Sequence, residues 1–248
     1  MAFLRFLYIL LLFSAVLNFQ AMAQNTIFLS EGKIEFERKE NLYAQLDPDQ
    51  PWTEELRKTM PQFKTTWFDL LFTRDKSLYK SGKEIADNNK MWERPAEGNI
   101  VYSELNNQKS ISQKKVFEQL FLVQDSIRKI SWKITDETRT IAGFNCRRAN
   151  AVILDSVYVV AFYTDEILTP GGPESFTGLP GMILGIALPH QHLTWFATKV
   201  QAVKVSDTEL TAPQKGKKMT NAALRQALNG SLKEWGKMGQ SFILAALL

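Results

Sequence analysis

The chain has 248 residues, a single cysteine and a formal net charge of +4 at neutral pH. One thiol cannot form a disulfide within the chain, so a hydrophobic core must stabilise the fold, and a chain of this length can bury one. The small basic excess lacks a dense cluster of Lys and Arg, which argues against a nucleic-acid-binding domain.

The amino-terminal segment has the pattern of a secretory signal peptide. Arg5 precedes an apolar run over residues 6–17, and the small residues Ala21 and Ala23 form a cleavage site before Gln24. The apolar run is shorter than the roughly 20 residues of a membrane span, although an uncleaved anchor is the alternative. We therefore predict a signal peptide over residues 1–23 and a mature domain over 24–248. The mature protein is expected in the periplasm or outside the cell, without a membrane anchor.

Short strands separated by turn residues dominate the mature sequence. Ile34 and Phe36 alternate with charged residues, which is typical of a strand with one buried face. Close spacing of such segments predicts an antiparallel meander, and we expect a single, strongly curved sheet of the half-barrel or barrel-like kind. The further predicted strands are 67–72, 78–79, 100–102, 116–123, 127–134, 146–154, 157–163, 182–188 and 193–203.

Two segments have helical patterns. Residues 52–60 follow Pro51 and place Glu54 and Glu55 in a first turn. A second, amphipathic helix begins after a cap-like Thr220, and its apolar positions indicate a tail over about 219–236 that packs on the sheet.

A loop rich in Gly and Pro over residues 171–181 is unlike the rest of the chain. Pro fixes its backbone and Gly permits positive φ or close approach, so the loop has a specified shape. It is either a packed corner of the sheet or a loop that contacts a ligand or partner. The residues that define this motif loop are Gly172, Pro173, Phe176, Gly178, Leu179, Pro180 and Gly181.

The hexamer over residues 178–183 resembles the motif of the GLPGLI family of exported proteins, with Met182 in place of the usual Leu. Segments 143–149, 162–167 and 194–199 resemble flanking parts of that family in the same order, and the match is looser from Gly32 onward. This resemblance implies export, a β-rich fold and no established activity. The meander is also similar to the half-barrels of bacterial lipoprotein carriers, which is a likeness of fold alone.

Catalytic and metal-binding patterns are sparse. His190 and His192 fall on one face of an extended segment, and Cys146 could join them as a soft ligand for copper. The alternatives are two solvated histidines and a buried structural thiol. No nucleophile elbow or phosphate-binding loop is present, and we expect no cofactor and assign no catalytic residue.

We therefore predict a non-catalytic, chaperone-like binding protein that holds an apolar small molecule, a lipid or a segment of an envelope protein. A metal-binding envelope protein that uses His190 and His192 is one alternative. An enzyme with dispersed carboxylates is another, because 26 acidic residues offer many pairs, and a polar cleft holding two of them would favour it.

Overall fold

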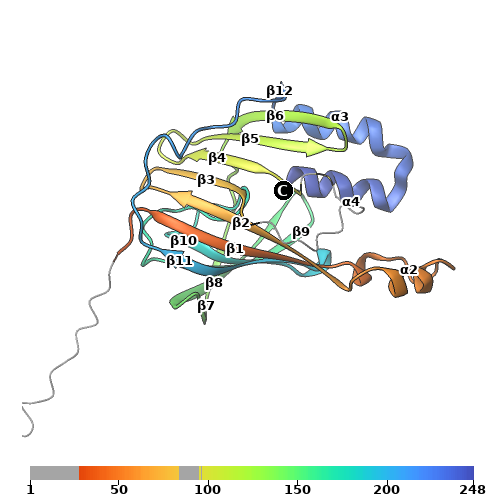
Figure 1. Cartoon of the computed structure of the whole chain (residues 1–248), viewed down its shortest axis with the longest axis horizontal. Coiled ribbons are helices and arrows are strands. Elements are labelled where there is room, and N and C mark those ends of the chain that lie inside the picture. Colours follow the sequence, from red (N-terminus) through yellow and green to blue (C-terminus); the bar gives the residue numbers. More distant parts are fainter. Residues whose placement is uncertain (1–27, 84–94, 96) are drawn as a thin grey trace, which may run out of the picture.

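The structure is a computed structural model that describes residues 28–83, 95 and 97–248. The predicted signal peptide, residues 1–23, lies outside the described residues. Within them, twelve strands form one sheet in the order β12-β6-β5-β4-β3-β2-β1-β11-β10-β9-β8-β7 (Figure 1). The strands are β1 Gly32–Asn41, β2 Phe63–Phe72, β3 Lys76–Ser81, β4 Ile100–Glu104, β5 Lys109–Val116, β6 Gln119–Ser126, β7 Lys133–Ile141, β8 Phe144–Ile153, β9 Val157–Thr164, β10 Met182–Leu188, β11 Leu193–Gln201 and β12 Lys217–Met219.

The sheet is mostly antiparallel and open. Among the strands of the described residues, only the short β12 runs parallel to its neighbour, β6, and β12 and β7 form the two edges. A barrel requires its edge strands to pair with each other, and these do not. The prediction of a mainly β, largely antiparallel sheet with terminal helices is confirmed, but its strongly curved, half-barrel form is wrong.

Short helices surround the sheet. The predicted amino-terminal helix is α2, Thr53–Thr59, which extends away from the sheet beyond the ends of β1 and β2 (Figure 1). Single 3-10 turns are η1, Tyr43–Gln45, and η3, Pro189–Gln191. At the carboxyl end, α3, Asn221–Leu232, leads through η4, Lys233–Trp235, to α4, Gly236–Leu247, and both helices lie beside β5 and β6.

The amphipathic helix is confirmed as α3. Its predicted cap, Thr220, accepts a hydrogen bond from the backbone N–H of Ala223 at 3.2 Å. Leu224, Leu228 and Leu232 recur every four residues and pack on the apolar face of β5 and β6. The helical tail is longer than predicted, because Gly236 takes a positive φ of 54°, the chain reverses, and α4 packs back on α3.

The hairpin between β5 and β6 turns earlier than the sequence pattern indicates. Predicted turn residues 124–126 lie in β6, and the actual turn is at Phe117 and Glu118. Phe117 has a positive φ of 53°, and its ring packs against the rings of Trp235 and Phe242 at 5.6 Å each. A bulky aromatic residue is an unusual choice for positive φ, so local turn preferences could not have located it.

One face of the sheet changes from apolar to charged along β1. Ile34 and Phe36 are fully buried in the main core, and period-two alternation puts Arg38 and Glu40 on the same face. Arg38 is 6% exposed and Glu40 is 1% exposed. This strand therefore begins in the hydrophobic core and ends in a buried polar region. No helix among residues 28–83, 95 and 97–248 is long and apolar enough to cross a membrane.

The motif loop is a packed corner. Gly178 and Gly181 have positive φ values of 92° and 140°, which confirms that the backbone needs glycine there. A Cβ at Gly181 would lie 2.1 Å from the carbonyl oxygen of Thr164, whereas one at Gly178 would meet only the Trp132 ring at 3.7 Å. Leu179 is 2% exposed, so it belongs to the core and is not an exposed tip.

The two glycines should respond differently to substitution. Gly178→Ala adds only the strain of positive φ, roughly 1–2 kcal/mol. Gly181→Ala adds a backbone collision as well, worth about a further 1–3 kcal/mol. Urea denaturation should therefore show a clearly larger loss of unfolding free energy for Gly181→Ala, and equal losses would contradict the packed corner.

Candidate functional site

Charged side chains from distant segments meet inside the molecule. We call this group the buried charge cluster. It contains three cations, three carboxylates and one amide, so its formal charges balance. Its members are Arg38, Glu40, Lys64, Glu97, Asn99, Lys114 and Glu174.

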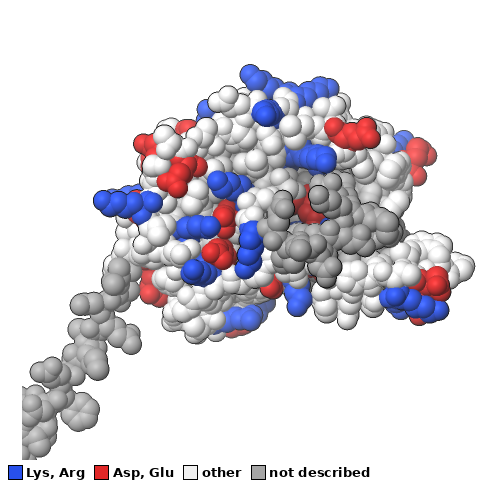
Figure 2. Space-filling model, in the orientation of Figure 1, with Lys and Arg blue, Asp and Glu red and all other residues white. Residues whose placement is uncertain are grey.

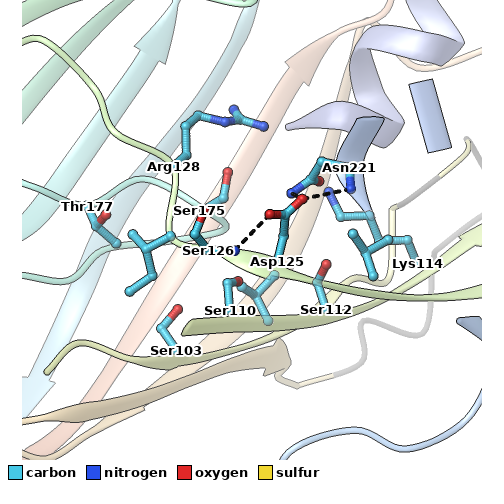
Figure 3. A pocket seen from close by; sticks show the side chains of 13 residues that line it. Ser103, Ser110, Ser112, Lys114, Asp125, Ser126, Arg128, Ser175, Thr177 and Asn221 are labelled. Carbon is cyan, nitrogen blue, oxygen red and sulfur yellow. Dashed lines mark hydrogen bonds between the residues drawn. The ribbon is translucent and has the colours of Figure 1, made fainter. Parts of the chain in front are cut away.

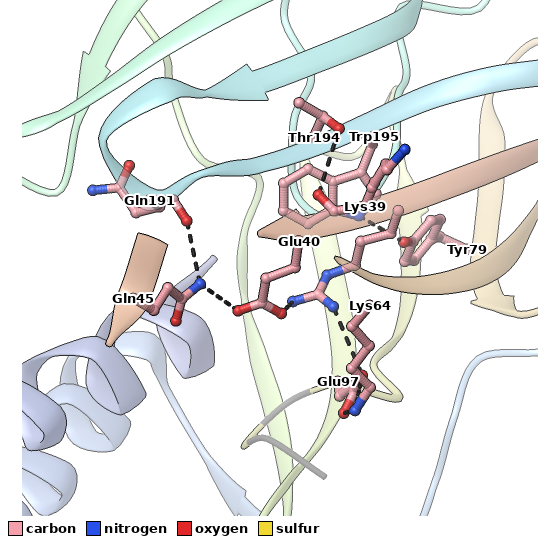
Figure 4. Close-up of polar contacts among 10 residues, drawn as sticks. Lys39, Glu40, Gln45, Lys64, Tyr79, Glu97, Gln191, Thr194 and Trp195 are labelled. Carbon is pink, nitrogen blue, oxygen red and sulfur yellow. Dashed lines mark hydrogen bonds and ion pairs between the residues drawn. The ribbon is translucent and has the colours of Figure 1, made fainter. Parts of the chain in front are cut away.

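Arg38 is the centre of one half of the cluster, and its partners Glu40, Glu97 and Trp195 are labelled in Figure 4. Its guanidinium lies 3.3 Å from a carboxylate oxygen of Glu40 and 3.8 Å from one of Glu97. Lys64 Nζ lies 2.7 Å from Glu97. The Arg38 guanidinium also lies 5.6 Å from the ring centroid of Trp195, so an aromatic face covers the cation on the apolar side.

Glu174 is the centre of the other half. It is 5% exposed and accepts a hydrogen bond from Asn99 Nδ2 at 3.0 Å. Burial raises the pKa of Glu174, and the nearby Lys114 charge, the Asn99 hydrogen bond and the Arg38 charge oppose that rise. Its backbone has a positive φ of 51°, a conformation that non-glycine residues adopt rarely and often at functional sites.

Lys114 is the second residue of the cluster whose pKa is shifted. It is 3% exposed, and its Nζ donates to the backbone carbonyl of Ala246 at 2.9 Å. Burial lowers the pKa of Lys114 to about 8, with Glu174 acting in the opposite direction. Arg128 and Ser175 donate to the carbonyls of Leu247 and Leu248, so three side chains bind the otherwise unpaired carbonyls at the end of α4.

A small polar pocket adjoins Lys114 (Figure 3). Alternate residues of β5 supply Ser110, Ser112 and Lys114 to its wall, and Ser175 and Thr177, which follow Glu174 in the chain, also line it. Its volume is about 20 Å³, which holds roughly one water molecule. Asp125 also lines the pocket and accepts a hydrogen bond from the backbone N–H of Asn221 at 2.9 Å.

A larger cleft of about 300 Å³ opens beside this pocket, and we call it the cationic cleft. The pocket and the cleft share Ile127, Arg128 and Thr177. Arg74 and Lys129 supply further positive charge to the cleft. Among the described residues that line it, none is Asp or Glu.

The residues predicted as sites fall in separate places. Five of the seven motif residues are buried, and Gly178 and Pro180 are exposed, with Gly178 in the wall of the cationic cleft. His190 and His192 are exposed at η3. Cys146 is fully buried on β8, and burial raises the pKa of its thiol to about 12, which confirms the structural interpretation of this residue. Within the described chain, no three His, Cys, Asp or Glu residues come together as a metal site.

Sequence reasoning missed the buried charge cluster. Glu174 lies within the motif loop, and Arg38 continues the alternation of β1, so each had a local signal. Nothing local indicates that they meet, because the sheet order brings together residues that are more than a hundred positions apart.

Comparisons with known proteins identify a family. A family model described as "N-glycanase peptide, N-terminal domain" (PNGase F-II) matches residues 69–225, well over half of the chain. Two crystal forms of PNGF-II have a similar fold, with TM-scores of 0.51 and 0.52 and identities of 18% and 16%. They cover 77% and 78% of this chain, which spans only 32% and 31% of theirs. No curated protein sequence matches the chain.

These findings correct two predictions. The expected membership of the GLPGLI family is wrong, since the matching model is that of the N-glycanase domain. The residues that resembled the GLPGLI motif form a packed corner and its flanking strands, and the fold itself requires such residues there. The expectation of a non-catalytic, chaperone-like binding protein is also wrong, because the matching family belongs to a hydrolase. The enzyme with dispersed carboxylates is the better of the alternatives.

Lys114 should make stability depend on pH. The unfolded chain holds its proton up to about pH 10.5, and the folded chain holds it only up to about pH 8. The unfolded state binds more protons between these values, so the unfolding free energy should rise with pH in this window. Relative to Lys114→Met, the wild type should gain on the order of 3 kcal/mol from pH 8 to 10.5. A difference that stays flat in urea titrations would contradict a buried Lys114.

Proposed function

The chain belongs to the family of N-glycanase peptide N-terminal domains, and on this premise we propose that it works as a region of an enzyme that hydrolyses the link between an N-glycan and its peptide. The family match over residues 69–225 supports the substrate class. The buried charge cluster supports the chemistry, because it combines carboxylates and cations in an enclosed site.

Hydrolysis of such a link needs one group that donates a proton to the leaving atom and another that accepts a proton from water. Lys114 suits the donor role and Glu174, as a carboxylate, the acceptor role, because burial shifts the pKa of each toward neutrality from opposite directions. General acids and bases work best when their pKa values lie near the operating pH. This pairing is the single observation that carries the residue-level proposal.

The remaining cluster residues hold Glu174 and its surroundings in place. Asn99 fixes one oxygen of Glu174, and Arg38 supplies a second positive charge near it. The polar pocket beside Lys114 shares Arg128 and Thr177 with the cationic cleft, so polar side chains lie between the cluster and the cleft. The signal pattern over residues 1–23 supports action on glycopeptides in the periplasm or outside the cell.

Glu174→Gln tests this assignment, because Gln keeps the shape and can still accept from Asn99 but cannot exchange a proton. The substrate is an N-glycosylated peptide, and mass spectrometry follows loss of the glycan. The wild type should release the glycan, and Glu174→Gln should slow release by about 10²–10⁴-fold. Release should also fall as pH drops through the raised pKa of Glu174, because its base form is lost.

Glu118→Gln is the matched control, since Glu118 is an exposed carboxylate in the β5–β6 turn. It should release the glycan at the wild-type rate. Circular dichroism of each variant checks that the fold is kept. An intact glycopeptide after incubation with folded wild-type chain, or equal rates for Glu174→Gln and Glu118→Gln, would refute the proposal.

A further inference from the structure

The cationic cleft has the composition of a binding site for an acidic ligand. Arg74, Arg128 and Lys129 bring three positive charges to one opening, and none of the described residues that line it is Asp or Glu. Cations in such proximity repel one another, so a site of this kind gains from an anion placed between them. Its volume of about 300 Å³ lies at the lower end of the range for small-molecule sites.

Two polar groups at the inner wall lack partners. Arg128 Nη1 and Thr177 Oγ1 are buried atoms without a hydrogen-bond partner, and Thr177 as a whole residue is 95% buried. Buried polar atoms in native proteins are nearly always paired, so these two atoms leave unused hydrogen-bonding capacity in residues that line the cleft. The other amino group of Arg128 donates to the Leu247 carbonyl, which holds the guanidinium in place.

Hydrogen bonds to backbone carbonyls hold separate loops together around the cleft. Thr169 Oγ1 donates to the carbonyl of Thr73 at 2.8 Å, which ties the loop after β9 to the turn that carries Arg74. The N–H of Ile127 donates to the carbonyl of Gln108 at 2.9 Å, which ties the segment that carries Arg128 and Lys129 to the β4–β5 turn. The cleft therefore has a defined shape that does not depend on a ligand.

The remaining lining groups suit a sugar. Asn106 and Gln108 offer amide donors and acceptors, which can bind hydroxyl groups. Leu105, Ile130 and Pro170 offer apolar surface for the C–H face of a ring. Arg is well suited to a carboxylate because its planar donors match the two oxygens.

From this arrangement we propose that the cationic cleft binds a carboxylate-bearing sugar of the glycan, such as a terminal sialic acid. The inference rests on the proposed function for the class of its ligand. The cationic cleft recognises acidic glycans, whereas hydrolysis belongs to the buried charge cluster. An acidic peptide segment is the competing ligand and is an outcome of the test.

Calorimetric titration of the full chain tests the proposal with three probes: a free sialylated N-glycan, the same glycan without sialic acid, and an acidic peptide. The sialylated glycan should bind, the neutral glycan should bind at least about tenfold more weakly, and added salt should weaken the difference. These free glycans have no peptide link to hydrolyse. Failure of binding therefore leaves the hydrolysis proposal standing, and failure of hydrolysis leaves this one standing.

Substitutions locate the binding. Arg128→Gln should weaken binding of the sialylated glycan roughly tenfold or more. Because Arg128 also binds the end of α4, the exposed Arg74→Gln and Lys129→Gln provide variants without that structural contact, and each should weaken binding severalfold. Lys204→Gln removes one exposed charge outside the cleft and should change nothing.

Equal affinity for the sialylated and neutral glycans would overturn the proposal, as would unchanged binding in Arg74→Gln and Lys129→Gln. Tighter binding of the acidic peptide, weakened by the same variants, would assign the cleft to the peptide part of the substrate and would also overturn it.

Discussion

Burial of charge is the constraint on which the interior of this protein depends. A charge taken out of water is costly unless opposite charges and hydrogen bonds surround it. Arg38, Glu40 and Glu174 are all at most 6% exposed, so each needs its partners in place. Removal of one member would leave its partners uncompensated. The cluster therefore couples β1, β2, β5 and the motif loop more strictly than apolar packing would.

The same constraint explains why the motif loop and α4 are held as they are. Glu174 can reach Lys114 and Arg38 only if the loop turns inward, and the rigid Gly and Pro backbone around it fixes that turn. Lys114 in turn binds the end of α4 through the Ala246 carbonyl. The corner that appears structural in isolation thus positions a carboxylate with a raised pKa, and its outer side forms a wall of the cationic cleft.

Period-two alternation predicted most of the strands, and the helical patterns predicted α2 and α3, because these signals are local. The predicted strand over 127–134 is wrong, since residues 127–132 are irregular and β7 begins only at Lys133. The glycine requirement at Gly178 and Gly181 and the burial of Cys146 could also be predicted from residue chemistry. The β5–β6 turn could not, since Phe117 takes positive φ under the influence of distant rings from α4 and η4. The charge cluster could not either, because strand order decides which residues meet and no local pattern encodes it.

The central claim is our proposal that Glu174 and Lys114 act on the link between an N-glycan and its peptide. A crystal structure of the Glu174→Gln variant bound to an N-glycosylated peptide tests it most directly. The account predicts that the junction of glycan and peptide lies against position 174 and Lys114, with the glycan extending along Arg128 and Thr177. A glycopeptide bound on another face of the sheet, with the cluster and the cleft unchanged, would contradict it.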